Sequence, residues 1–412
     1  GNVGGLVGSI NNSTIENSYA KGNLTSYSAS KYTGIGGIVG SSGAASTISN
    51  CYAQTVIDSP QEYSTNKGGI IGYIDEASTL NNNYFDSTTA GLSAVYGYAM
   101  NGVSANENYA LSDLSQMTKP DSWSDDIWDF SGSTPILKQN TSGATAVNSG
   151  TIKINNVSIN LSGASIDDAI SQINAQSSQT GVVASIENNK VVLKNTDGST
   201  NNISVESGTS NFFDVAGIEA SEPARSISSD VPVITGNVGQ AEEVGSIQRL
   251  TREEAIAQGY TIIDSAQGLL DLGMMQTLSG RYILMGDIDL SSFSPGNYSF
   301  LGDLTGEFNG NGYTIKNLNI QSTVAQTNIG LFSKIDGGTV KNLNFENANV
   351  SGEYRVGILA GYATGSAYIE NVNVSNSLVN VNGTSDVAAG GLIGYAQSET
   401  DTLTITGSKV TN

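Results

Sequence analysis

The sequence predicts a mostly β protein with β-helix (solenoid) segments at both ends and a small α+β domain between them. Three observations predict this. A glycine-rich apolar phrase recurs along most of the chain, and a phrase rich in threonine, isoleucine and asparagine follows it. The period fails from Tyr96, and a different pattern with an amphipathic helix occupies residues 151–218. A repeat with a nearly fixed period of this length is typical of a solenoid.

The glycine-rich phrase reads GGLVG at 4–8, GGIVG at 36–40 and GGIIG at 68–72, and successive starts lie 32 residues apart. It returns as GILAG at 357–361 and GGLIG at 390–394. Each repeat holds short runs of alternating apolar residues and no helical apolar stripe. One repeat cannot bury its apolar side alone. Turns must therefore stack at the strand spacing of ~4.8 Å.

Stacked turns place equivalent residues in columns along the axis. We expect an asparagine ladder and an aromatic ladder, made by Asn17, Asn50, Asn82, Asn317, Asn342 and Asn371 and by Tyr19, Tyr52 and Tyr84. The apolar positions expected to point into the core are Ile15, Ile48, Leu80, Ile315, Val340 and Ile369. A β-barrel also uses short strands, but it does not need matching residues at every repeat.

These phrases resemble the GLUG motif repeats of bacterial surface and secreted proteins, over residues 1–145 and about 246–412. The resemblance implies a right-handed β-helix in an adhesin-like or structural setting, and no particular ligand.

Composition narrows the possible partners. The 412-residue chain has a net charge of −21 and a pI near 4.1, which argues against binding nucleic acid or an anionic membrane. A single cysteine, Cys51, excludes an intramolecular disulfide framework, and its place in the repeat matches Ser18 and Asn83. No apolar run is long enough to span a membrane, and no signal peptide is present. Because the chain opens within a repeat, we expect a fragment of a larger, extracellular protein.

Residues 1–95 are expected to form three turns, after which the period fails. Residues 111–117 read as a short helix, followed by Trp123, Trp128 and Phe130. Large aromatic residues suit a cap over the open end of a stacked core. The alternative is an exposed aromatic binding platform. The first domain is thus 1–145, β-helix turns with an aromatic cap.

The second domain, 146–238, is a linker followed by a ββαβββ module ending near Ile218. Its strands are expected at 151–154, 157–161, 182–186, 190–194 and 202–205, and its amphipathic helix at 165–174, with Ser165 as N-cap. This segment resembles the flagellin hook IN motif, through TIKINNVSINL, SIDDAISQINAQ, TGVVASIENNKVVLKN and NFFDVAGI. In that family the motif is a structural module of extracellular filaments.

The third domain, 239–412, is expected to open with capping helices and then begin a second β-helix. Thr251 and Glu254 form a capping box, and residues 265–275 read as another helix. Residues 281–290 begin the strands. The first β-helix segment thus has no N-terminal cap and the second no C-terminal cap. Reading Asn412 on into Gly1 completes one repeat phrase. We therefore expect end-to-end assembly of the chain with itself, as a covalent tandem array or as separate chains.

The sequence predicts no enzyme, cofactor or metal site. The chain has no histidine, which removes Ser-His-Asp, Cys-His and HExxH arrangements. Some GLUG-bearing proteins are zinc peptidases, but that activity cannot reside in this segment. Three function classes remain: a structural unit of a surface fibre, an adhesin for glycans or proteins of a host or neighbouring cell, and a flagellin or hook-associated variable region. The adhesin would use the loops at 26–33, 58–66 and 396–402.

Overall fold

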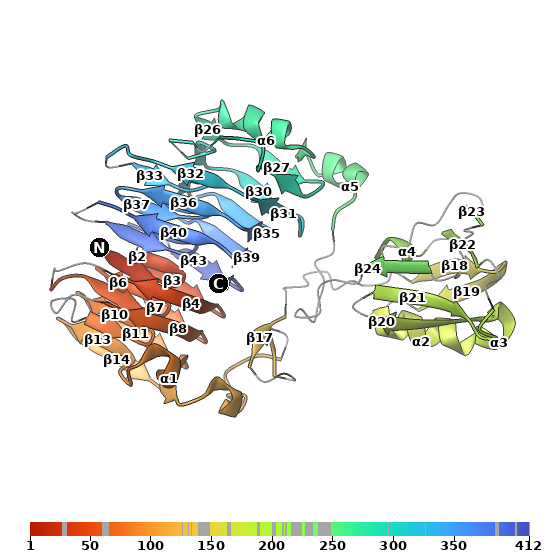
Figure 1. Ribbon diagram of the computed structural model, residues 1–412, viewed down its shortest axis with the longest axis horizontal. Helices are drawn as coiled ribbons and strands as arrows, with labels where there is room; N and C mark the ends of the chain where they lie inside the picture. The colour runs from red at the N-terminus through yellow and green to blue at the C-terminus, as the bar shows by residue number, and fades with distance from the viewer. Residues whose placement is uncertain are drawn as a thin grey trace. The chain divides into compact units, whose positions relative to one another are not determined.

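The computed structural model divides into two compact units, Gly1–Pro135 with Arg249–Asn412, and Ile136–Gln248 (Figure 1). It describes all residues except 27–30, 60–65, 126, 131, 133, 139–148, 163–165, 188–189, 200–202, 208–209, 211, 216–224, 227–233, 238–248, 295, 298, 326, 384–386, 400–401 and 412. Most of residues 139–150 and 219–245, which are expected as linkers on either side of the module, lie outside the described residues. So do the expected N-cap Ser165 and parts of all three expected adhesin loops.

The first unit is a stack of short parallel strands in four sheets (Figure 1). In spatial order, the six-stranded sheet contains β33 (Asn328–Ile329), β37 (Arg355–Gly357), β41 (Ala388–Gly390), β1 (Asn2–Gly4), β5 (Gly34–Gly36) and β9 (Asn66–Gly68). The nine-stranded sheet contains β26 (Thr277–Leu278), β29 (Asp303–Leu304), β34 (Phe332–Asp336), β38 (Ala360–Thr364), β42 (Ile393–Gln397), β2 (Val7–Asn11), β6 (Val39–Ser42), β10 (Ile71–Ile74) and β13 (Tyr96–Ala99).

The 17-stranded sheet carries the threonine- and asparagine-rich phrases. Its strands are β25 (Thr261–Ile263), β27 (Arg281–Leu284), β28 (Ile288–Asp289), β30 (Glu307–Asn309), β31 (Thr314–Lys316), β35 (Thr339–Glu346), β39 (Tyr368–Ser375), β43 (Leu403–Thr406), β44 (Lys409–Thr411), β3 (Ser13–Glu16), β4 (Tyr19–Thr25), β7 (Thr47–Ser49), β8 (Tyr52–Asp58), β11 (Ser78–Asn81), β12 (Tyr84–Asp86), β14 (Val103–Asn106) and β15 (Tyr109–Leu111). A small parallel sheet contains β32 (Asn319–Gln321), β36 (Asn349–Gly352) and β40 (Leu378–Val381).

The N-terminal and C-terminal strands meet in the middle of this stack. In three sheets the C-terminal strands pair with the N-terminal ones: β41 with β1, β42 with β2, β43 with β3 and β44 with β4. The marked chain ends accordingly lie within the stack and not at its two ends (Figure 1). Two open β-helix ends were expected from the sequence. In the structure these ends close on each other, and one continuous solenoid results.

The core runs through the solenoid as columns of branched apolar side chains. Ile15, Ile48 and Leu80 are register partners and fully buried, and Val340 and Ile369 are likewise buried partners. Each such side chain contributes about 1.5–3 kcal/mol through its burial. The paired glycines are needed where backbones approach closely, since a Cβ on Gly5 would lie 2.2 Å from the Gly37 carbonyl oxygen.

Two helices begin the C-terminal half. Helix α5 (Arg252–Ala257) starts at the capping box of Thr251 and Glu254, and α6 (Ala266–Gly273) is capped by Ser265. Helix α6 lies at one end of the solenoid near β26, and α5 lies beside β27 (Figure 1). After the N-terminal turns, α1 (Ser87–Ala90) follows β12. The helix expected over 111–117 is a single 3-10 turn, η1 (Leu114–Gln116).

The second unit is an α+β module (Figure 1). Its elements are β17 (Ile136–Leu137), β18 (Gly150–Ile154), β19 (Val157–Leu161), α2 (Ile166–Ala175), α3 (Ser177–Thr180), β20 (Val182–Glu187), β21 (Lys190–Asn195), β22 (Ser204–Ser207), α4 (Phe212–Val215), β23 (Arg225–Ser226) and β24 (Ile234–Asn237). Strands β18 and β19 form an antiparallel hairpin, whose turn residues Asn155 and Asn156 have φ of 50° and 64°. Asparagine tolerates this left-handed conformation better than most residues.

Among the described residues, no helix has the length and apolar character needed to cross a membrane.

Candidate functional site

The seam between the two halves of the solenoid is the first candidate site, and we define it as the pairing of β41–β44 with β1–β4. Its backbone bonds include Asn2 N–H to the Val387 oxygen at 2.9 Å and Tyr19 N–H to the Ser408 oxygen at 3.1 Å. Ile15 and Ile405 are buried register partners across it. The seam has the same geometry as the pairing between any two successive turns, so it can join turns that the peptide chain does not connect.

The asparagine residues occupy corners of the coil. Asn17, Asn50 and Asn82 follow strands that pair in register, and their φ values are 48°, 52° and 52°. Asn342 and Asn371 hold the same place in the C-terminal turns, with φ of 54° and 52°. Between the two groups lies Gly407, with φ of 59°. The left-handed backbone conformation thus accounts for asparagine or glycine at this corner.

Asn317 does not lie in this column. It follows β31, which pairs with the second half of β35, so its register neighbours are Asn347 and Asn376. These three residues have φ of 59°, 55° and 48° and form a second corner column. Because β35 is long enough to cover both β30 and β31, one turn has two asparagine corners. The spacing of asparagines along the chain did not distinguish the two corner columns.

A polar ladder, buried except at its last member Asn108, lies one residue after the first asparagine column. Its members are Ser408, Ser18, Cys51, Asn83 and Asn108. Ser408 N–H donates to Ser18 Oγ at 3.2 Å, Cys51 N–H to Asn83 Oδ1 at 3.1 Å, and Asn83 Nδ2 to Asn108 Oδ1 at 2.8 Å. Burial raises the pKa of the Cys51 thiol to about 12. The ladder was detectable only through the shared position of Ser18, Cys51 and Asn83 in the repeat.

The tyrosines form a column on the flank of the solenoid. Tyr19, Tyr52, Tyr84 and Tyr109 are successive register partners. The rings of Tyr19 and Tyr52 stack at 4.6 Å and 7°, and those of Tyr84 and Tyr109 stack at 5.0 Å. Their neighbours Ala20, Ala53 and Phe85 point into the core instead, because side chains alternate along a strand.

Trp123, Trp128 and Phe130 are here called the tryptophan clamp, and they cover the first three tyrosines of this column. Trp128, in β16 (Trp128–Asp129), lies 6.3 Å from the Tyr19 ring and 5.8 Å from that of Tyr52, and Trp123 lies 5.5 Å from Tyr84. Phe130 packs on Trp123 at 5.8 Å. Trp123 Nε1 also donates to the Asn82 oxygen at 3.1 Å.

The expectation that the clamp covers the open end of the core is therefore wrong. The clamp lies across the flank of three turns. The last turn, β13 to β15, leaves Tyr98 49% and Tyr109 44% exposed. Aromatic residues can cover the side of a solenoid as readily as its open end. The sequence does not distinguish these two arrangements.

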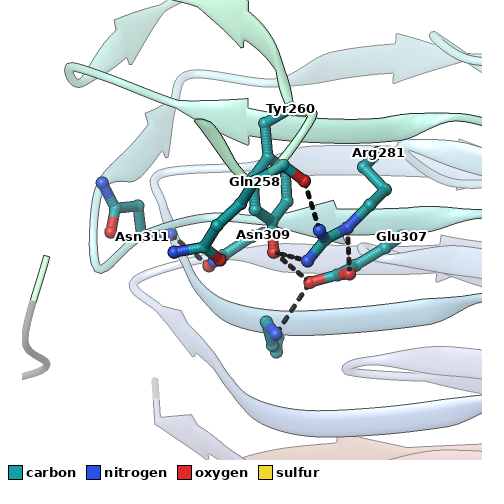
Figure 2. Close-up of polar contacts among 7 residues, drawn as sticks. Gln258, Tyr260, Arg281, Glu307, Asn309 and Asn311 are labelled. Carbon is teal, nitrogen blue, oxygen red and sulfur yellow. Dashed lines mark hydrogen bonds and ion pairs between the residues drawn. The ribbon is translucent and has the colours of Figure 1, made fainter. Parts of the chain in front are cut away.

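A charged cluster near the helical end was not expected from the sequence (Figure 2). Glu307 accepts hydrogen bonds from Arg281 Nε at 2.9 Å, from Lys341 Nζ at 2.7 Å and from the Tyr260 hydroxyl. Arg281 also lies over the Tyr260 ring, 4.0 Å from its centroid. Burial opposes the charge of Glu307, but the hydrogen bonds from Lys341, Tyr260 and Arg281 outweigh it and lower the pKa of this carboxyl. The cluster joins three strands to Gln258 and Tyr260, which directly follow α5.

Three protein-family profiles match parts of the chain. Residues 1–25 match the GLUG motif, and residues 145–197 match the flagellin hook IN motif. The chain carries both motifs. Residues 261–376 match the M26 IgA1-specific metallo-endopeptidase N-terminal region. The chain contains no histidine. Within the described residues, no three His, Cys, Asp or Glu side chains group so that they could hold a metal ion.

Halomucin from Haloquadratum walsbyi is similar to 47% of the chain, with 29% identity over 218 residues. The matched chain spans about 2% of that protein's length. No solved structure matches the chain.

Proposed function

We propose that the chain is a structural repeat unit of an extracellular surface fibre, and that its right-handed β-helix assembles end to end. The GLUG motif, the hook IN motif and the likeness to Halomucin support an extracellular surface setting. The observation that carries the proposal is the seam. Gly357, Gly390, Gly4 and Gly36 are successive register partners, so the repeat continues unbroken from the C-terminal turn to the N-terminal turn.

End-to-end assembly follows if the seam forms between units. The C-terminal turn of one unit would receive the N-terminal turn of the next, with the same hydrogen bonds as within one chain. An unpaired turn exposes strand edges and core residues, so it favours a partner of identical register. The module at 150–218 would then recur once in each unit along the fibre.

The mass of the source polypeptide under strongly denaturing conditions tests the covalent form. A mass several times 42.6 kDa supports a tandem array, while a mass near 42.6 kDa supports separate chains. For separate chains, the test is whether the seam also forms between two chains. The chain is refolded at increasing concentration, and light scattering and electron microscopy detect any assembly. Oligomers in steps of one unit support the proposal. A 42.6 kDa source polypeptide that also stays monomeric at every concentration would contradict it.

An adhesin is the second candidate function. Tyr32, in one of the expected contact loops, is 56% exposed, and Lys31 Nζ lies 4.9 Å from its ring centroid. Exposed aromatic residues on loops are frequent in binding surfaces. Binding to cell-surface glycans or proteins that is lost in Tyr32→Ala would favour this function. The match to the flagellin hook IN motif supports a third candidate function, a variable region of a flagellin or hook-associated protein.

A further inference from the structure

A column of register partners on the nine-stranded sheet carries two tyrosine pairs. The rings of Tyr362 and Tyr395 stack at 5.7 Å and 23°, and those of Tyr73 and Tyr98 at 5.9 Å and 9°. From Lys334 onward, the column reads Lys334, Tyr362, Tyr395, Ser9, Ser41, Tyr73 and Tyr98. It crosses the seam between Tyr395 and Ser9, and two serines separate the two pairs.

Among the described residues, a guanidinium lies over the first pair and none lies over the second. Arg355 comes from β37 in the adjoining six-stranded sheet, and its Cζ lies 4.1 Å from the Tyr395 centroid and 4.8 Å from that of Tyr362. Tyr354 presents a third ring at 4.7 Å. Three aromatic rings therefore hold one cation, and all four side chains are only partly buried.

Arg355 differs from two other arginines of the solenoid, Arg281 and Arg249, in its polar contacts. Arg281 bonds to Glu307 and Tyr260, and Arg249 donates to the Gly312 oxygen at 3.0 Å. Within the described part of the chain, the Arg355 guanidinium has ring contacts but neither a hydrogen bond nor an ion pair. Guanidinium has five N–H donors. The N–H donors of Arg355 lie at a partly exposed position, where the guanidinium packs on three tyrosine rings and no described residue accepts a hydrogen bond from it.

The adjacent cation of the column is already neutralised. Lys334 Nζ lies 2.7 Å from Asp336 Oδ2, so Arg355 supplies the local unpaired positive charge in a chain of net charge −21. The Tyr395 hydroxyl accepts a hydrogen bond from Asn11 Nδ2 and keeps its own O–H as a donor. The phenol groups of Tyr354 and Tyr362 offer both donors and acceptors next to Arg355. A planar fork of donors matches the two oxygens of a carboxylate, and tyrosine hydroxyls suit the hydroxyl groups of a sugar.

We propose that Arg355, Tyr354, Tyr362 and Tyr395 form a binding site for an anionic sugar of an acidic glycan. The guanidinium binds the anionic group, and the tyrosines contact the sugar ring and its hydroxyls. Carboxylate and sulfate groups share this chemistry, and the experiment distinguishes them. The site lies within one solenoid and is independent of end-to-end assembly, so it can hold whether or not the fibre proposal does.

The test is calorimetric titration of the full chain with three short ligands: a uronate disaccharide, a sulfated disaccharide and a neutral disaccharide. It is done at about 0.15 M salt, where a Debye length of about 8 Å screens repulsion from distant carboxylates. Binding of the uronate or the sulfated sugar, without binding of the neutral one, supports the site and identifies its anion. Binding of no anionic ligand, or equal binding of all three, overturns the proposal.

Variants separate a binding role from a structural one. Arg355→Met should abolish binding. Arg355→Lys keeps the charge but loses the fork, and should weaken binding about tenfold, which corresponds to one charge-assisted hydrogen bond. Tyr98→Ala disrupts the other tyrosine pair and should leave the affinity unchanged. Thermal unfolding shows whether each variant folds. If Arg355→Met is folded and binds as tightly as the wild type, the assignment is wrong.

Discussion

Gly4 and Gly390 are register partners on neighbouring parallel strands. Gly36 lies beyond Gly4 in the same column, and Gly357 lies beyond Gly390. The column thus passes from the C-terminal half to the N-terminal half with no change of register. This relationship makes the seam a joint that two parts of one chain, or two successive units, can form in the same way.

A side chain at Gly390 should break the seam. A Cβ there would lie 2.0 Å from the Ile393 oxygen and 2.7 Å from Gly8 N. We expect Gly390→Val to lower the free energy of unfolding of the solenoid by several kcal/mol, roughly 3–5, because backbone must move on both sides of the seam. Urea unfolding followed by tryptophan fluorescence measures it, since both tryptophans belong to the solenoid.

Gly102→Val is the control for that variant, because a Cβ at Gly102 meets nothing within 4 Å. It should unfold close to the wild-type midpoint. If Gly390→Val and Gly102→Val unfold at the same urea concentration, the backbones do not approach each other closely at Gly390.

The asparagine corner should accept glycine but not a β-branched residue. Asn50 has φ of 52°, and Gly407 occupies the same corner in another turn. We expect Asn50→Gly to change the unfolding free energy little, and Asn50→Val to cost more than the roughly 1–2 kcal/mol of a left-handed residue. Ser49→Val, on the preceding strand, is the control, because valine suits a strand. Similar losses for Asn50→Val and Ser49→Val would contradict the conformational explanation.

The two tryptophans of the clamp should differ in their response to phenylalanine. Trp123 Nε1 donates to the Asn82 oxygen, whereas Trp128 Nε1 is buried without a partner among the described residues. Both substitutions remove similar apolar volume. We therefore expect Trp123→Phe to cost about 1 kcal/mol more than Trp128→Phe, the typical net contribution of one hydrogen bond. Thermal unfolding of the two variants by circular dichroism compares them, and the reverse order would disprove the stated hydrogen-bond role.

The charged cluster should make stability depend on pH. The pKa of Glu307 is lowered in the folded state, so its contribution is complete above the ordinary glutamate value of about 4.3 and is lost as the pH falls through the lowered value. We expect Glu307→Gln to cost roughly 1–2 kcal/mol at pH 7, a figure reduced for the partial exposure of Arg281 and Lys341.

That difference from the wild type should disappear at pH values below the lowered pKa. Chemical denaturation over a pH series measures it, with the exposed Glu253→Gln as a control. A difference that stays constant with pH would mean that Glu307 acts through packing and not through its charge.

The sequence by itself determined the repeat, its period and the kind of residue at each position. Ile15, Ile48 and Leu80 could be assigned to one core column because a coil places equivalent residues at equal intervals. The motif at 1–25 and the module at 145–197 were also recognisable, since their residue order is local. The corner role of asparagine follows from backbone sterics, which act within a few residues.

Only the tertiary structure decided which distant segments meet. It placed Gly4 against Gly390 of the same chain, the clamp on the flank of the Tyr19 column, and Asn317 in a separate corner column. It also brought Glu307 to Arg281 and Lys341, and Arg355 to its tyrosines. These contacts depend on the length of each turn and on how the sheets adjoin. Periodicity describes one turn well, but neighbours across turns follow from packing of the whole coil.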